Sequence, residues 1–424
     1  MQYITDLHLH SRYARACSPQ LTLPNISRFC ALKGVNVVAV PDFTHPKMFA
    51  EAEQQLEPAG EGIYKLKGSA DATRFIFSTE ISCIYSQGGQ RQNGGASKVR
   101  RLHIVIMAPS REVAGKINAA LGKIGNLHSD GRPILGLSGK RLAEIVWEIS
   151  PEVMVIPAHA WTPWFAVFGS KSGFDSLAEC FEEYTDRIYA IETGLSSDPA
   201  MNWRLSALDR VALVSNSDSH SLQNIGREAN VFDLPELSYA SIVNTIKSKD
   251  PKKFLYTIEF YPEEGMYHFD GHRDCGVSFK PSETKKNQGI CPKCKRPLTV
   301  GVLNRVEALA DRPEGFVPPG AIPYKSLVEL DKIIAEALDI KSRQSKQVQA
   351  VYNDLVKKGV SEMNILLNLS YSELAAITEP KIVEGIRRMR EGRLNIQPGF
   401  DGQYGKVEIF RPDERAEKWQ KSLF

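Results

Sequence analysis

The chain has 424 residues, of which 42% are apolar and 24% charged, and its formal net charge is +3. This length provides material for more than one globular domain, and the small charge does not by itself indicate a nucleic-acid partner. No segment approaches the roughly 20 consecutive apolar residues that span a bilayer, and seven cysteines fit a reducing compartment. We therefore expect a soluble cytoplasmic protein with no membrane partner.

Short β-branched runs alternate with segments of helical periodicity over about the first half of the chain. Most of the segments between these runs carry Ser or Asp at the expected start of a helix and Gly at its end. This alternation predicts an α/β fold with either a parallel barrel or a doubly wound sheet. Residues 86–97, rich in Gly and Gln, are expected to form a mobile loop. The expected strands are residues 3–9, 35–42, 74–80, 102–108, 152–160, 187–194 and 211–220.

Histidines and carboxylates lie in or at the ends of these strands. In a barrel the carboxyl ends of the strands converge on one face, where barrel enzymes carry their chemistry. His8 and His10 are two residues apart, so both side chains point the same way from one strand. A lone histidine in such a position usually caps or packs, but six of the nine histidines occupy corresponding positions. We therefore expect a metal cluster held by His8, His10, Asp42, His45, Glu80, His103, His159, Asp218 and His220.

Six motifs resemble, in this order, those of the polymerase and histidinol phosphatase (PHP) family: DLHLHS, VPDFTHP, STEIS, LHIVIMA, IPAHAW and SNSDSH. The resemblance covers about residues 1–230 and implies a distorted seven-stranded barrel that hydrolyses phosphoesters with three metal ions. Imidazole and carboxylate suit zinc, manganese or iron ions, and Mg²⁺ is a further candidate. Metal-bound water is a nucleophile near neutral pH, and we expect Glu80, His159 and Asp218 to be catalytic. The spacing does not separate metal ligation from proton transfer.

A second metal site is expected downstream of the barrel. Cys291 and Cys294 form a CxxC pair, and Cys275 precedes them together with His272 or His268. We favour His272 because its gap to Cys275 matches the gap of the CxxC pair. Four such ligands leave no place for water, so this zinc ion is expected to be structural.

The predicted domain order follows from these motifs and from composition. A Pro- and Gly-rich linker precedes a helical segment that resembles a helix-hairpin-helix, although plain helical packing is an equal alternative. The basic side chains of Lys357, Lys358, Arg387, Arg388 and Arg390 line either a DNA track or a solvated surface. The predicted limits are a barrel at 1–235, a zinc module at 236–312, a linker at 313–330, a helical domain at 331–412 and a tail at 413–424.

The chain as a whole is similar to the endonuclease Q family of repair nucleases. The resemblance implies a partner DNA that contains deaminated bases (uracil, hypoxanthine or xanthine) or abasic sites, nicked on the 5′ side. The alternatives are a phosphoesterase for small molecules or undamaged nucleic acid, and a binding protein with an inactive barrel. Expected substrate contacts are Arg12, Tyr13, Trp161, Trp164 and Phe165, although the aromatic rings can instead pack the loop onto the barrel. Gln420, Leu423 and Phe424 resemble a sliding-clamp peptide, or else a frayed terminus.

Overall fold

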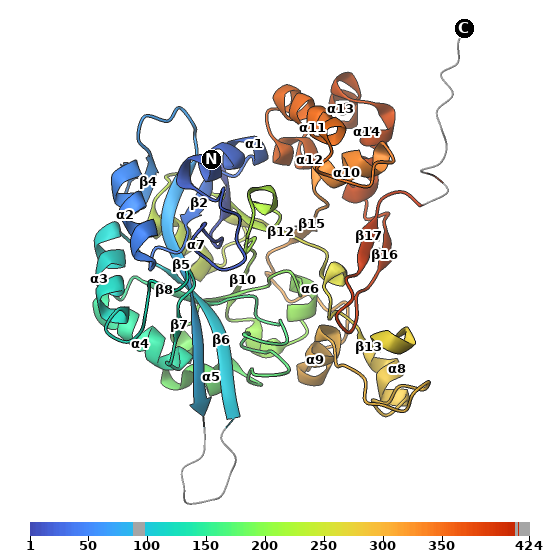
Figure 1. Ribbon diagram of the computed structural model, residues 1–424, viewed down its shortest axis with the longest axis horizontal. Helices are drawn as coiled ribbons and strands as arrows, with labels where there is room; N and C mark the ends of the chain where they lie inside the picture. The colour runs from blue at the N-terminus through green and yellow to red at the C-terminus, as the bar shows by residue number, and fades with distance from the viewer. Residues whose placement is uncertain (88–97, 412–413, 415–424) are drawn as a thin grey trace, which may run out of the picture.

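The structure is a computed structural model that describes residues 1–87, 98–411 and 414 (Figure 1). Most of the expected loop at 86–97 and the three residues of the expected clamp peptide lie outside the described residues. Among the helices described, there is none whose length and hydrophobicity suffice to cross a membrane.

All seven expected strands form, and they surround the histidines of the expected cluster. Strands β1, β2 and β5 are parallel neighbours, and β9 and β10 pair in parallel. The amide of Ala160 beyond β8 donates to Glu192 O at 2.9 Å, which links β8 to β9. Leu9 beyond β1 and Ser219 beyond β10 form a parallel bridge. The seven strands are β1 (Gln2–Asp6), β2 (Val37–Val40), β5 (Arg74–Gln87), β6 (Lys98–Met107), β8 (Met154–Pro157), β9 (Ala190–Glu192) and β10 (Ala212–Val214).

The α/β class is confirmed, but the parallel pairing typical of such alternation does not hold for every strand. Strand β6 runs antiparallel to both β5 and β8. Strands β5 and β6 pair with each other along ten residues, from Ser78 opposite Met107 to Gln87 opposite Lys98, which fixes β6 in the opposite direction to β5. The central sheet is therefore mixed.

The sheet also extends beyond the limits that composition suggests. Strand β11 pairs antiparallel with β1, β12 pairs with β11, and β15 adds in parallel to β12. The sheet thus crosses the expected boundaries at 235 and 313. The additional strands are β3 (Leu56–Gly60), β4 (Ile63–Leu66), β7 (Ile134–Leu135), β11 (Ala229–Asp233), β12 (Phe254–Glu259) and β15 (Tyr324–Ser326).

Helices cover the outside of this sheet, and alternation along the strands separates two cores. Val38 and Phe75 pack outward against the helices, whereas their neighbours Val37 and Ile76 pack in a second cluster with α7. Ser110, Ser138 and Ser238 cap the helices that follow them by accepting backbone N–H groups. The helices are α1 (Leu23–Lys33), α2 (Pro46–Gln55), α3 (Arg111–Leu121), α4 (Gly139–Ile149), α5 (Leu177–Phe181), α6 (Pro199–Asn202) and α7 (Tyr239–Ser248).

Two smaller parts flank the sheet on one side, as Figure 1 shows. The module expected to bind zinc, called the zinc module below, contains β13 (Asp270–His272), β14 (Val277–Phe279), α8 (Pro281–Lys286) and α9 (Val302–Leu309). The helical group has a core that continues into Val231 and Ile258 of the sheet. It consists of α10 (Leu330–Ala337), α11 (Lys346–Gly359), α12 (Glu362–Leu367), α13 (Tyr371–Ile377), α14 (Pro380–Arg390), β16 (Asn395–Gln397) and β17 (Lys406–Glu408). Short 3-10 helices lie at Glu182–Arg187, Ser206–Leu208, Leu222–Asn224, Pro262–Glu264 and Arg273–Cys275.

Candidate metal centre and cleft

The first two histidines are buried beyond the end of β1, and each is held by a carboxylate. His8 Nδ1 lies 3.1 Å from both oxygens of Glu192, and His10 Nδ1 lies 2.9 Å from Asp42 Oδ1. Their Nε2 atoms are buried and have no hydrogen-bond partner. A carboxylate on one ring nitrogen fixes the ring and leaves the other nitrogen to a metal ion. His8 and His10 therefore fit metal ligation.

Glu80, which lies in β5, joins two groups of possible ligands. One group consists of His8, His10, Glu80 and Asp218, and the other of Glu80, His103 and His159. Within each group the ligand atoms lie within 4.8 Å of one another. Glu80 Oε1 is 2.9 Å from His103 Nδ1 and 3.0 Å from His159 Nε2, while Oε2 is 3.4 Å from His10 Nε2. One carboxylate is thus placed to bridge two ions.

The charges around these groups favour a cation. Burial opposes ionisation of Glu80, but His103 and His8 outweigh it and hold the pKa of Glu80 well below its usual value. Burial likewise opposes the protonation of His8 and His10, yet the neighbouring carboxylates raise the pKa of both. For His103, burial dominates and lowers the pKa to about 4, which keeps its imidazole neutral as a ligand requires.

Three residues of the site have a positive φ, which is uncommon outside glycine. The φ angle is 48° at Asp42, 29° at His159 and 44° at Asp218. Such conformations cost on the order of 1–3 kcal/mol each and gather at functional sites. Gly194 makes room for one of them, because a Cβ at this position would come within 2.5 Å of His159 Cβ. The backbone at these strand ends is therefore shaped around the site.

Three of the nine expected ligands lie outside both groups. Asp42 uses one oxygen for His10 and the other for the Ser11 amide, at 2.6 Å. His45 stacks on Tyr13 with ring centroids 4.6 Å apart. His220 is next to the site, because its ring centroid is 4.7 Å from that of His10.

Two residues of the site escaped the sequence analysis. Glu192 holds His8 and also accepts the His159 amide at 2.9 Å. It ends β9, so the strand-end argument that selected Glu80 applies to it equally. Arg132 Nη1 lies 3.0 Å from Glu80 Oε2. Arg132 comes from the irregular segment between α3 and β7, where no pattern in the sequence signals it.

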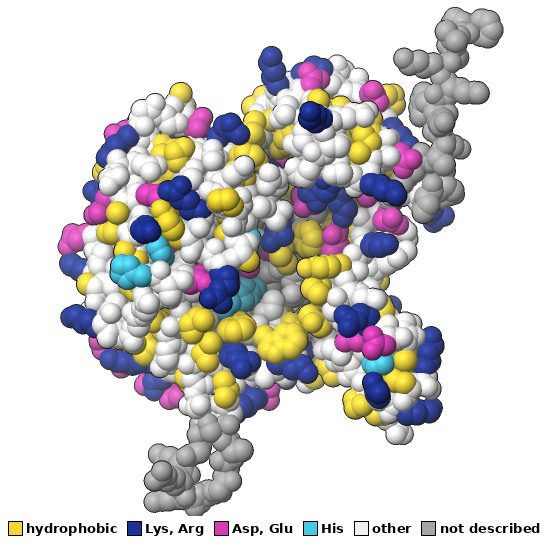
Figure 2. Space-filling view, in the orientation of Figure 1, with side chains coloured by type: hydrophobic (Ala, Val, Ile, Leu, Met, Phe, Trp, Pro, Cys, Tyr) yellow, Lys and Arg dark blue, Asp and Glu magenta, His cyan; other side chains and the backbone are white. Residues whose placement is uncertain are grey.

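A cleft of about 740 Å³ opens beside the two groups. Its floor includes His103, His159 and Asp218, and a wall is formed by Pro262, residues 264–268 and Tyr404. Figure 2 shows this hollow, with histidine at its floor and hydrophobic side chains along its rim. Arg132 and Arg227 also line it and are its only Lys or Arg residues among those described. The cleft can therefore admit an anionic ligand to the metal groups.

The expected substrate contacts divide between the cleft and the protein interior. Trp164 and Phe165 line the cleft. Trp161 does not, because it is completely buried and its Nε1 donates to Asn202 Oδ1 at 2.7 Å. The expectation that Trp161 touches a substrate is therefore not supported by its position. Arg12 and Tyr13 both bind the Glu51 carboxylate and do not line the cleft.

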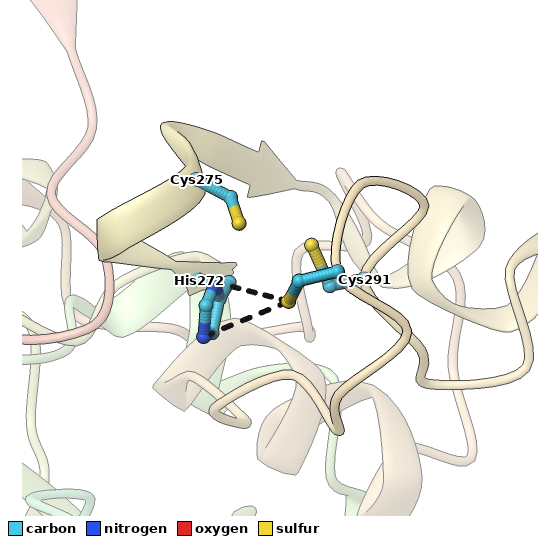
Figure 3. A group of neighbouring side chains, drawn as sticks. His272, Cys275 and Cys291 are labelled. Atoms are coloured by element: carbon cyan, nitrogen blue, oxygen red, sulfur yellow. Dashed lines mark hydrogen bonds between the residues drawn. The ribbon is translucent and has the colours of Figure 1, made fainter.

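The second metal group lies in the zinc module. His272, Cys275, Cys291 and Cys294 bring their ligand atoms within 4.8 Å of one another (Figure 3). Cys294 Sγ is 3.6 Å from His272 Nδ1. Burial opposes ionisation of Cys291, but the backbone amides of Cys294 and Lys293 lower its pKa, which favours a thiolate. His268 is not in this group and lines the cleft instead. Three sulfurs and one imidazole fit the ligand set of a structural zinc ion.

Comparison with known proteins extends these observations to the whole chain. A crystal structure of the lesion-specific endonuclease PfuEndoQ from Pyrococcus furiosus superposes with a TM-score of 0.84 and 27% identity, covering 100% of this chain and 98% of that one. A structure of endonuclease Q in complex with a 27-mer duplex bearing an abasic lesion gives 0.83 and 27%, covering all of both chains. The resemblance to endonuclease Q is confirmed. The chain has, over its full length, the fold of a lesion-specific DNA endonuclease.

Curated relatives of this endonuclease Q-like chain are themselves uncharacterised. Protein MJ0043 of Methanocaldococcus jannaschii is 32% identical over 279 residues, which is 62% of this chain but 34% of the relative. The chain thus spans about a third of the length of MJ0043. Protein YqxK of Bacillus subtilis is 26% identical over 388 residues, 89% of each chain. A family model described as the MJ0043 C-terminal domain matches residues 329–393.

The matched residues contain most of the helical group, where the expected basic track is largely engaged in internal contacts. Arg390 donates to the carbonyls of Ile365, Leu366 and Leu369 at the end of α12. Arg388 binds both oxygens of Glu414. These two guanidinium groups support the packing of the endonuclease Q-like helical group.

Proposed function

We propose that the protein is a DNA repair endonuclease that hydrolyses the phosphodiester on the 5′ side of deaminated bases and abasic sites with several metal ions. The observation that carries the proposal is the position of Glu80 between two histidine groups at the floor of a cleft. The likeness to endonuclease Q structures, one of them with an abasic duplex, supports the substrate class.

The finer fold belongs to the same proposal. We infer that the seven strands form a distorted PHP-type barrel, followed by a zinc ribbon and a helical DNA-binding domain. The link from β8 to β9 and the bridge from Leu9 to Ser219 support closure of the barrel. The thiol and imidazole cluster supports the ribbon, since a module this small needs a metal ion to hold it.

The residues of the two groups have distinct roles in this mechanism. His8, His10, Glu80, His103, His159 and Asp218 would hold Zn²⁺, Mn²⁺ or Mg²⁺. When bound, such ions supply a nucleophilic hydroxide near neutral pH and stabilise charge on the phosphate. Asp42 and Glu192 hold the imidazoles that they contact, and His220 flanks the site. His45 stays a predicted ligand, although its ring stacks on Tyr13.

The cleft supplies the contacts to the DNA. Arg132 and Arg227 present guanidinium groups to phosphate oxygens, and Trp164 and Phe165 present aromatic faces to an extruded base. A deaminated base pairs weakly and therefore leaves the duplex at a lower cost, which gives selectivity without extensive base reading. Binding of a sliding clamp through Gln420, Leu423 and Phe424 stays a prediction from the sequence.

End-labelled duplexes test the proposal. Each carries uracil, hypoxanthine, an abasic site or no lesion, and is incubated with Mg²⁺, Mn²⁺ or Zn²⁺. We expect a nick on the 5′ side of each lesion and no nick in the undamaged duplex. Glu80→Gln should abolish nicking, whereas Glu148→Gln, an exposed change on α4, should not. Hydrolysis of a small phosphate ester without any DNA cleavage would instead favour the small-molecule phosphoesterase.

A further inference from the structure

The turn that joins β16 to β17, residues 398–405, is fixed to the wall of the cleft although it lies far downstream in the chain. Gly399 N donates to Glu263 O at 2.8 Å, and the Phe269 amide donates to Gly399 O at 2.9 Å. Gly402 N donates to Met266 O at 3.0 Å. Backbone bonds of this kind hold the turn in one position.

Side chains and glycines add to this attachment. The Asp401 carboxylate accepts the Thr299 hydroxyl and the Arg273 amide, both at 2.6 Å. Gly405 lies so close to the neighbouring segment that a Cβ on it would overlap Glu263 O. A side chain at 405 would therefore push the turn away from the wall. The turn is therefore a rigid support for Tyr404, which it carries.

Tyr404 is 74% exposed and lines the cleft. Trp164, which also lines the cleft, is 38% exposed and packs edge-to-face on Tyr267, with ring centroids 5.5 Å apart. Among the described residues that line the cleft, Trp164 and Tyr404 are the only large hydrophobic side chains that are more than about a third exposed. An aromatic ring left in water on a rigid support is suited to stack against a ligand.

We propose that Tyr404 is a wedge that enters the duplex at the lesion and stacks in the gap left by the extruded nucleotide. This inference rests on the proposed function. Extrusion costs the duplex its base stacking at the lesion, and an aromatic ring restores stacking with either neighbour whatever their sequence. The rigid turn matters, because a mobile tyrosine would lose conformational freedom on insertion, and this loss would offset part of the free energy gained by stacking.

The decisive comparison is between duplex and single-stranded substrates. A single strand has no stack to open, so a wedge contributes to cleavage of the duplex alone. We expect Tyr404→Ala to lower kcat/KM for a uracil-containing duplex by about 10- to 100-fold and to change the value for the same single strand by less than about threefold. Tyr404→Trp should retain most of the duplex activity. Tyr189→Ala, which removes a partly exposed tyrosine outside the cleft, is the matched control.

A second readout needs no cleavage. 2-Aminopurine placed next to the uracil reports unstacking by its fluorescence, measured with Glu80→Gln added to the wild type and to each variant so that no strand is nicked. We expect the wild type, Tyr404→Trp and Tyr189→Ala to raise the fluorescence and Tyr404→Ala to fail to do so. Equal losses on duplex and single strand, or an unchanged fluorescence rise with Tyr404→Ala, would overturn the wedge. If the wild type cleaves no lesion, the proposed activity fails, and the fluorescence still decides the role of Tyr404.

Discussion

At the scale of single residues, Glu192 shows how a buried carboxylate can govern a metal centre without ligating it. It binds His8 Nδ1 with both oxygens, accepts the His159 amide and receives a hydrogen bond from Asn216. It therefore orients one histidine from each of the two groups. Partners of this kind raise the basicity of the ligand and fix its ring.

Glu192→Gln should keep the shape of the site and remove the charge. An amide oxygen can still accept the His159 N–H, but it does not stabilise His8 as a carboxylate does. We expect metal affinity or the nicking rate to fall by about 10- to 100-fold. Competition with a Zn²⁺ or Mn²⁺ indicator measures the affinity. Glu183→Gln, which changes an exposed residue paired with Lys140, serves as the control, and equal values for the two variants would argue against this role.

Most members of the two groups of possible metal ligands were predictable from the sequence. The carboxyl ends of the strands in such a fold converge on one face, and this does not depend on the exact positions of the helices. His8, His10, Glu80 and Asp218 follow this rule, and Glu192 follows it too once the sixth strand is read in the same way. Arg132 was not predictable, since its segment has no periodicity. Trp161 was placed wrongly because a sequence does not distinguish an aromatic ring that faces a cleft from one that fills the core.

At the scale of secondary-structure elements, β12 carries a buried carboxyl behind the site. Glu259 accepts hydrogen bonds from Thr193 at 2.9 Å and from Thr257 at 2.5 Å. Burial nevertheless dominates and raises its pKa to about 8. Burial and the nearby Glu259 also raise the pKa of Glu228. Near neutral pH Glu259 in β12 and Glu228, which immediately precedes β11, are therefore protonated.

This protonation makes stability depend on pH. Between about pH 4.5 and pH 8, Glu259 keeps its proton in the folded protein and loses it in the unfolded chain. The unfolded state then binds fewer protons, so the free energy of unfolding falls as pH rises, by at most about 1.4 kcal/mol per pH unit for one such group. Glu259→Gln should flatten the decline of the melting temperature over this range. The exposed control Glu236→Gln should follow the wild type. If the melting temperature of Glu259→Gln falls with pH as steeply as that of the wild type, the prediction is wrong.

The predicted zinc module has a small core, so we expect its folding to depend on its metal group. Only a small apolar cluster around Val277 and Leu298 packs inside it. We expect Cys291→Ser to lower the zinc content by one ion per chain and to expose residues 270–300 to proteolysis, while the sheet stays folded. Elemental analysis and timed trypsin digestion measure both effects. Lys285→Ala, an exposed change on α8, should behave as the wild type; full zinc retention by Cys291→Ser would count against the assignment.

The elements themselves show where sequence reasoning ends. Seven strands were predicted because each is a short β-branched run, but the antiparallel pairing of β6 with β5 and β8 is a tertiary contact that periodicity does not reveal. Strand β15 comprises three residues inside an expected linker, and its pairing with β12 is a tertiary contact without a local signal.

At the scale of the whole molecule, a buried ion pair joins the helical group to α1, one of the helices that cover the sheet. Lys33 Nζ at the end of α1 lies 2.9 Å from Glu362 Oε2 in α12, and both side chains are almost inaccessible. Glu362 also accepts the Leu330 amide at 3.1 Å and the Tyr352 hydroxyl at 2.7 Å. A single carboxylate thus ties α1 to α10, α11 and α12, and it holds the helical group in place beside the cleft.

Lys33→Met should weaken this junction, because it leaves the Glu362 charge buried without its cation. Removing one member of a buried pair costs about 3–5 kcal/mol, whereas replacing both members can be nearly neutral. We therefore expect the helical group of Lys33→Met to unfold in urea before the sheet, and the double variant Lys33→Met/Glu362→Gln to recover part of the loss. Metal affinity at the cluster should not change, since neither residue lies in a ligand group. A single urea transition of Lys33→Met at the wild-type midpoint would show that the helical group is held by its apolar core alone.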